Sequence, residues 1–107
     1  MLDSIKKIKV MPEFESTGIW DYETDEMLDL LVLDLSENLI HTLDSWTEFY
    51  EECFVNNGTY DTMIPDKCLE LNSRGLEIAK RIKVLYPNIE VVYMGEDEKG
   101  VHPLITV

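Results

Sequence analysis

The most conspicuous absence in this 107-residue sequence is that of Lys and Arg between Val10 and Asp66. That stretch of 57 residues contains fifteen Asp or Glu side chains, so its formal charge is −15. The rest of the chain carries nine basic and seven acidic residues, which leaves +2 there and −13 in total. The middle segment cannot form salt bridges within itself, and its carboxylates repel one another. Two explanations stay open: solubility alone, or a surface that meets a basic partner.

The sequence also has no run of 18 apolar residues, so no segment is expected to span a membrane. Residues 1–7 have no apolar core of the kind that secretion signals contain. The only cysteines, Cys53 and Cys68, form no CxxC pair, and we expect both to be reduced in a cytosolic protein. The negative charge argues against nucleic acid and against anionic membranes as partners.

Catalytic and metal-binding motifs are missing as well. The two histidines, His41 and His102, support no nucleophilic triad, and the five glycines form no phosphate-binding loop. Asp21 to Val32 resembles a calcium loop, but Glu26 and Val32 stand where an EF-hand needs Gly and Glu. Asp and Glu pairs are too abundant here to identify an acid–base dyad. We therefore expect no enzyme, no cofactor and no metal.

The remaining composition is that of one folded domain, with 45% apolar and 29% charged residues. Apolar spacing predicts helices over residues 36–54 and 65–86, and strands over 5–11, 89–94 and 101–107. The last two strands are close enough to form a hairpin. We predict an α+β fold with two layers, in which two helices cover a small, mostly antiparallel sheet of at least three strands.

Two segments of the acidic stretch are harder to assign. Residues 13–27 show no clean period and are predicted to be a loop. Trp20 in that loop either fills the core or contacts a partner, whereas Tyr22 favours a partner contact. Residues 28–35 are rich in Leu and Val and fit either a short strand or the beginning of the next helix. Asp34 or Ser36 can cap that helix.

The first predicted helix has two contrasting faces. Leu39, Leu43, Trp46 and Tyr50 recur at three- and four-residue steps and define the buried face. Acidic residues and His41 occupy the opposite face, where no lysine one turn away relieves their repulsion. An uncompensated cost of this kind indicates a use in binding. The residues that we predict to bind a partner are Trp20, Asp21, Tyr22, Glu23 and Asp25 in the loop and Asp44, Glu48, Glu51 and Glu52 on the helix.

Several short patterns, spread over about two thirds of the chain, carry a family resemblance. They are Trp20-Asp21-Tyr22, Leu43-x-x-Trp46-x-x-x-Tyr50, Gly75-Leu76-x-x-Ala79 and Val91-x-Tyr93. In these the chain resembles the bacterial immunity proteins of contact-dependent growth inhibition and other polymorphic toxin systems. The resemblance implies a cytosolic protein without catalysis of its own that binds one cognate toxin domain, often a nuclease. It assigns no toxin-contacting residue, and the tail after Gly95 is longer than the family pattern.

We therefore predict an immunity protein that binds a basic toxin domain one to one, with carboxylates standing in for nucleic-acid phosphates. One alternative is an acidic adaptor or nucleic-acid mimic that binds several basic proteins. Another is a small metal-dependent hydrolase.

Overall fold

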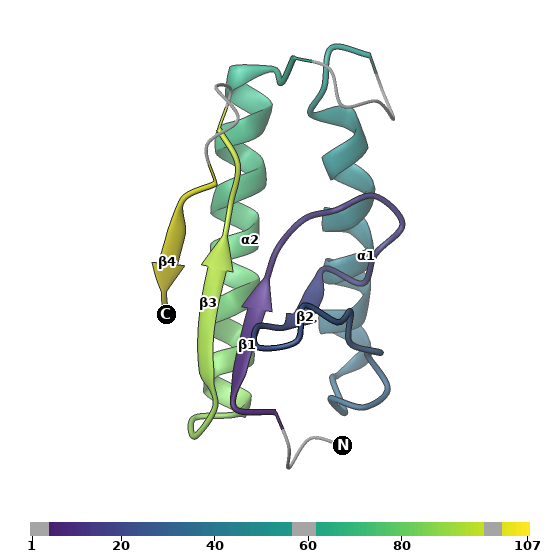
Figure 1. Cartoon of the computed structure of the whole chain (residues 1–107). Helices are drawn as coiled ribbons and strands as arrows, with labels where there is room; N and C mark the ends of the chain where they lie inside the picture. The colour runs from purple at the N-terminus through teal and green to yellow at the C-terminus, as the bar shows by residue number, and fades with distance from the viewer. Residues whose placement is uncertain (1–4, 57–61, 98–101) are drawn as a thin grey trace.

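The fold is a four-stranded sheet with two antiparallel helices packed on one of its faces (Figure 1). The computed structural model describes residues 5–56, 62–97 and 102–107. The strands are β1 (Lys7–Val10), β2 (Ile19–Asp21), β3 (Glu90–Met94) and β4 (Leu104–Thr106), in the order β2-β1-β3-β4. The helices are α1 (Glu37–Glu52) and α2 (Pro65–Leu85). This arrangement confirms the predicted α+β class and its two layers.

The sheet mixes strand directions. β1 pairs antiparallel with β2 and parallel with β3, and β3 pairs antiparallel with β4. The parallel pairing at the centre follows from the chain path, because both helices lie between β1 and β3 in sequence. Ile8 and Val10 of β1 are fully buried, whereas Lys9 between them belongs to the opposite face of the sheet.

The prediction that residues 13–27 are entirely a loop was wrong, because Ile19–Asp21 form the edge strand β2. Ile19, Trp20 and Asp21 are too few to show the alternation of apolar and polar residues by which a strand is recognised. The open edge of β2 is covered by the chain that follows, since Leu28 N donates to Ile19 O and Asp21 N donates to Glu26 O.

Residues 30–34 form a turn, so the predicted short strand or helix start over 28–35 was also wrong. Asp34 has a positive φ of 49° and does not cap the helix. The cap is Ser36, whose Oγ accepts from Leu39 N at 3.2 Å. The helix α1 then buries Leu39, Leu43, Trp46 and Tyr50, as their spacing predicts.

The helix α2 starts with Pro65 in its first turn and ends two residues before Pro87. Gly75 lies on its buried face, and a Cβ atom there would come within 2.3 Å of the Tyr93 ring and 2.6 Å of the Trp46 ring. Gly75 therefore makes room for two aromatic rings. The Trp46 indole donates to Leu71 O at 2.9 Å and joins the two helices.

The predicted C-terminal hairpin is confirmed by the pairing of β3 with β4. Both cysteines are buried and neither forms a disulfide, as expected for reduced thiols. Burial is the main cause that raises the pKa of Cys53 to about 12, so this thiol stays protonated at neutral pH.

Candidate partner-binding surface

The acidic face of α1 is built by the same periodicity that builds the core. Because four apolar residues turn one side of α1 inward, Asp44, Glu48, Glu51 and Glu52 are left exposed to solvent. Across residues 5–56, 62–97 and 102–107, none of these four carboxylates forms an ion pair. These four carboxylates therefore lack an ion-pair partner among the described residues, while Arg74 of α2 contacts α1 at Ser45 and Phe49.

The backbone of α1 does not offset this charge. The last turn of the helix contains no basic residue, and Glu51 and Glu52 lie at the end where the helix dipole disfavours anions. Glu48 is three and four residues before them, which adds repulsion between side chains of like charge. Both effects raise the free energy of the isolated protein and are relieved when a cation approaches.

The five predicted loop residues lie on β2 and the turn after it, where one of the three carboxylates has an ion pair. Lys9 Nζ lies 2.8 Å from Asp25 Oδ1, and Lys7 Nζ lies 4.0 Å from the centre of the Tyr22 ring. Asp21 Oδ1 accepts from Glu23 N at 3.0 Å and shapes the turn. Lys9 therefore neutralises one carboxylate of the turn from within the fold, whereas the ion pair of Lys7 is with Glu90 of β3.

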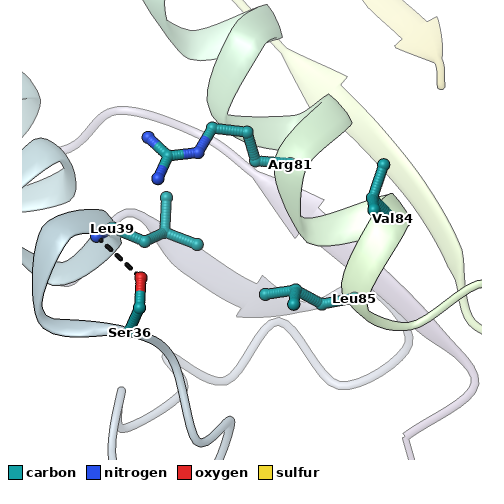
Figure 2. Close-up of a pocket in the computed structure, with 5 residues that line it drawn as sticks. All are labelled: Ser36, Leu39, Arg81, Val84 and Leu85. Carbon is teal, nitrogen blue, oxygen red and sulfur yellow. Dashed lines mark hydrogen bonds between the residues drawn. The ribbon is translucent and has the colours of Figure 1, made fainter.

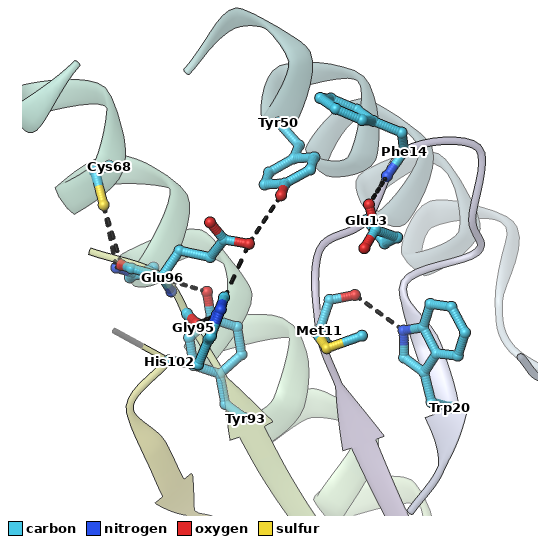
Figure 3. Close-up of polar contacts among 11 residues, drawn as sticks. Met11, Glu13, Phe14, Trp20, Tyr50, Cys68, Tyr93, Gly95, Glu96 and His102 are labelled. Atoms are coloured by element: carbon cyan, nitrogen blue, oxygen red, sulfur yellow. Dashed lines mark hydrogen bonds and ion pairs between the residues drawn. The ribbon is translucent and has the colours of Figure 1, made fainter. Parts of the chain in front are cut away.

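Trp20 is half-buried and anchored to the neighbouring strand end. Its indole nitrogen donates to the Met11 carbonyl at 3.1 Å (Figure 3), and its backbone forms a bridge with Met27. The side chain is neither sealed in the core nor fully presented to solvent.

The predicted residues therefore fall into two groups rather than one cluster. β2 and its turn belong to the sheet layer and α1 to the helix layer, and the two elements have no close backbone contact (Figure 1). Gly18 lies between them with a φ of 83°, and a Cβ atom there would be 2.9 Å from the Trp46 ring and 3.2 Å from Thr47. We call Asp44, Glu48, Glu51 and Glu52 the acidic helix face, and Asp21, Tyr22, Glu23 and Asp25 the acidic turn.

Lys9 was not among the predicted site residues, although it pairs with Asp25 of the acidic turn. The sequence contained a signal for this pair, since Lys9 is a cation placed between Ile8 and Val10, two apolar residues of the same strand. Only the pairing of β1 with β2 places its ammonium group against Asp25, which is 16 residues away.

A second feature missed from the sequence is the half-buried carboxylate of Glu96, just after β3. Tyr50 donates to Glu96 Oε1 at 2.8 Å, and Asn72 and Cys68 donate to the Glu96 carbonyl (Figure 3). Burial is the main cause that raises the pKa of Glu96, and the Tyr50 hydrogen bond partly opposes it. This network fixes the chain after β3 to both helices.

Neither a metal site nor a membrane helix is present in the part of the chain that the structure describes. No group of three or more His, Cys, Asp or Glu side chains converges there to hold an ion. No described helix is both long enough and apolar enough to cross a membrane.

Comparison with known proteins identifies the family of this chain. No curated protein matches the chain. A family model described as Serratia CdiI immunity protein-like matches residues 6–96, from just before β1 to just after β3. The matched region contains both acidic groups and leaves residues 1–5 and 97–107, with β4, outside. Members of this family neutralise a toxin and are typically not enzymes, and the chain belongs to the Serratia CdiI immunity protein-like family.

Proposed function

We propose that this chain neutralises the toxin domain of one cognate CdiA protein by binding it one to one in the cytosol, and that the acidic helix face is the principal docking surface. The partner surface is basic, as expected for a toxin domain that acts on nucleic acid. A nuclease is therefore the proposed class of toxin.

The observation that carries this proposal is the absence of compensation on α1. Four exposed carboxylates occupy the face of α1 that points away from the core, and none has an ion pair within the described residues. Their repulsion destabilises the isolated protein, so the stability of the fold gives no reason for the arrangement. Contact with Lys and Arg side chains of a partner would relieve it.

The mechanism that we propose is occlusion by mimicry of phosphate charge. A toxin that binds nucleic acid needs exposed cations, and these would pair with Glu48 and Glu51 in place of backbone phosphates. Long-range attraction would also speed encounter by roughly 10- to 1,000-fold over a neutral pair. Close charge pairs across such interfaces couple by roughly 1.5–7 kcal/mol each.

The acidic turn has a secondary place in this proposal. Asp25 already pairs with Lys9, so a toxin cation would have to compete with an internal partner. Glu23 is exposed, and Tyr22 presents an aromatic ring beside Lys7. Trp20, Asp21, Tyr22, Glu23 and Asp25 remain predicted contacts at the rim of the interface.

The test is protection and binding with the toxin domain of the CdiA protein encoded beside this gene. Co-expression should restore growth of cells that produce this toxin, and purified proteins should bind in a 1:1 ratio with an affinity that falls as salt is added. An affinity that is indifferent to salt would reject the electrostatic docking. Protection against unrelated nucleases would favour a general mimic, and loss of protection with a chelator would favour the hydrolase.

A further inference from the structure

One end of the molecule exposes apolar side chains that the acidic helix face does not use. Among the large apolar side chains in the described ranges, Leu31 and Val84 are the most exposed, at 83% and 79%. Leu31 belongs to the turn before α1, and Val84 to the last turn of α2. The Tyr86 hydroxyl donates to the Leu33 carbonyl and ties this turn to the end of α2. We call Leu31, Val32, Val84 and Leu85 the apolar end.

A hollow of about 270 Å³ opens at the same end, between the start of α1 and the end of α2. Ser36 and Leu39 line it from α1, and Arg81, Val84 and Leu85 line it from α2. Figure 2 shows Arg81 extending from α2 toward α1 above Leu39, with Val84 and Leu85 on the other side. The hollow therefore has aliphatic walls and one guanidinium group at its rim.

The charges around the apolar end are of both signs. Asp29, Asp34 and Glu37 are exposed on the turn and at the start of α1. Lys80 is exposed on α2, and Arg81 donates to Asn38 Oδ1 at 3.0 Å but pairs with no carboxylate of the described residues. An acidic half thus lies beside a basic half, whereas the acidic helix face has one sign only.

A surface with an acidic and a basic half is complementary to a copy of itself. A twofold axis through such a surface places the acidic half of each copy against the basic half of the other. Elsewhere a second copy would meet the net charge of −13 and be repelled. Charge complementarity therefore selects a second copy over a basic partner, which the basic half would repel.

We propose that the apolar end is the interface of a twofold-symmetric dimer of this chain, in which Leu31 of each copy fills the hollow beside Arg81 of the other. The interface buries Val84 and Leu85 and pairs Arg81 with a carboxylate of the partner copy. The acidic helix face runs from the middle of α1 to its C-terminal end, away from this end of the molecule, so each copy keeps it open. A dimer would then bind two toxin domains.

The test measures the mass of the purified protein over a range of concentrations by sedimentation equilibrium. The wild-type chain should reach twice its 12.4 kDa mass. Val84→Asp should weaken dimerisation about 100-fold or more, because the lost apolar contact and the added charge occur twice in each dimer. Leu69→Asp is the matched control, since Leu69 is an exposed apolar residue of α2 (71%) at the opposite end of that helix. It should leave the dimer intact.

A monomeric wild-type chain, or equal losses for Val84→Asp and Leu69→Asp, would overturn the proposal. Leu31→Asp checks the result at a second site, and circular dichroism establishes that each variant folds. A monomeric chain whose Val84→Asp variant loses toxin binding would assign the apolar end to the toxin instead and would also overturn the dimer. Toxin affinity is measured separately, so failure of the dimer leaves the proposed function standing.

Discussion

The acidic turn and the acidic helix face come from the same cation-free stretch of sequence, yet they differ in electrostatic state. In the turn, the Asp25 carboxylate lies 2.8 Å from the ammonium group of Lys9, and Tyr22 lies beside Lys7. On the helix face, Glu48 and Glu51 have no such partner in the described ranges. Charge counted along a sequence therefore does not measure the charge that a folded surface offers to a partner.

This difference reverses the expected sign of mutational effects. Removing the Asp25 carboxylate from the turn disrupts an internal pair, so stability should fall while binding weakens only slightly. Removing one from the helix face relieves repulsion, so stability should rise while binding weakens. The following variants are chosen to test this opposition.

The largest expected effect is a loss of toxin affinity on reversing a helix-face charge. Glu48→Lys should weaken binding of the toxin domain about 100-fold, which corresponds to roughly 2.7 kcal/mol, because attraction becomes repulsion at the centre of the interface. Isothermal titration calorimetry measures the change. Glu77→Lys, at an exposed position of α2, is the control for net charge alone. Equal losses in both variants would mean that the helix face has no special part.

A smaller effect is expected from Asp25→Asn. Lys9 is only 7% exposed, so removing its partner leaves a poorly solvated ammonium group, at a cost of about 1–2 kcal/mol of unfolding free energy. Asn accepts the positive φ of 60° at this position, so the backbone does not confound the result. Urea denaturation measures the loss of stability, and toxin affinity should fall far less than in Glu48→Lys, because Asp25 lies at the rim of the proposed interface. A stable variant whose binding weakens as much as that of Glu48→Lys would place Asp25 at the centre of the interface instead.

Lys9→Met should lower the unfolding free energy by less, about 0.5–1 kcal/mol, although it removes the same ion pair. Met keeps the packing of the Lys9 stem, and the stranded group is now Asp25, which is mostly in water. Comparing the urea midpoints of the two variants gives the order directly. The account requires Asp25→Asn to be the more damaging of the two.

The smallest expected effect is a gain of stability on neutralising the end of α1. Glu52→Gln should raise the unfolding free energy by about 0.5 kcal/mol, because it removes an anion from the negative end of the helix dipole. The gain should shrink in high salt, where the repulsion is already screened. Thermal unfolding at low and high ionic strength measures it. A loss of stability would show that Glu52 has a stabilising role.

Sequence periodicity predicted the elements with long regular patterns. Leu39, Leu43, Trp46 and Tyr50 defined α1 because a helix of four turns repeats its spacing often enough to be recognised. β2 was missed because three residues cannot establish an alternation. The segment 28–35 was misassigned because its Leu and Val density carries no period, and its hydrogen bonds are those of a turn.

The candidate surface was predictable in part for a related reason. Periodicity placed Glu48 and Glu51 opposite the buried face, and this requires only the helix itself. The state of Asp25 depends on Lys9, and the pair forms through strand register between β1 and β2. Register is a property of tertiary structure, so local sequence could not distinguish a compensated carboxylate from an uncompensated one.

The most direct test of the helix face as docking surface is an amide hydrogen-exchange footprint of the toxin domain on this chain. Exchange is compared for the free protein and for the complex, peptide by peptide. The account predicts new protection centred on residues 44–52 of α1, with little change at residues 21–25. Protection centred on residues 21–25, with α1 unchanged, would contradict it.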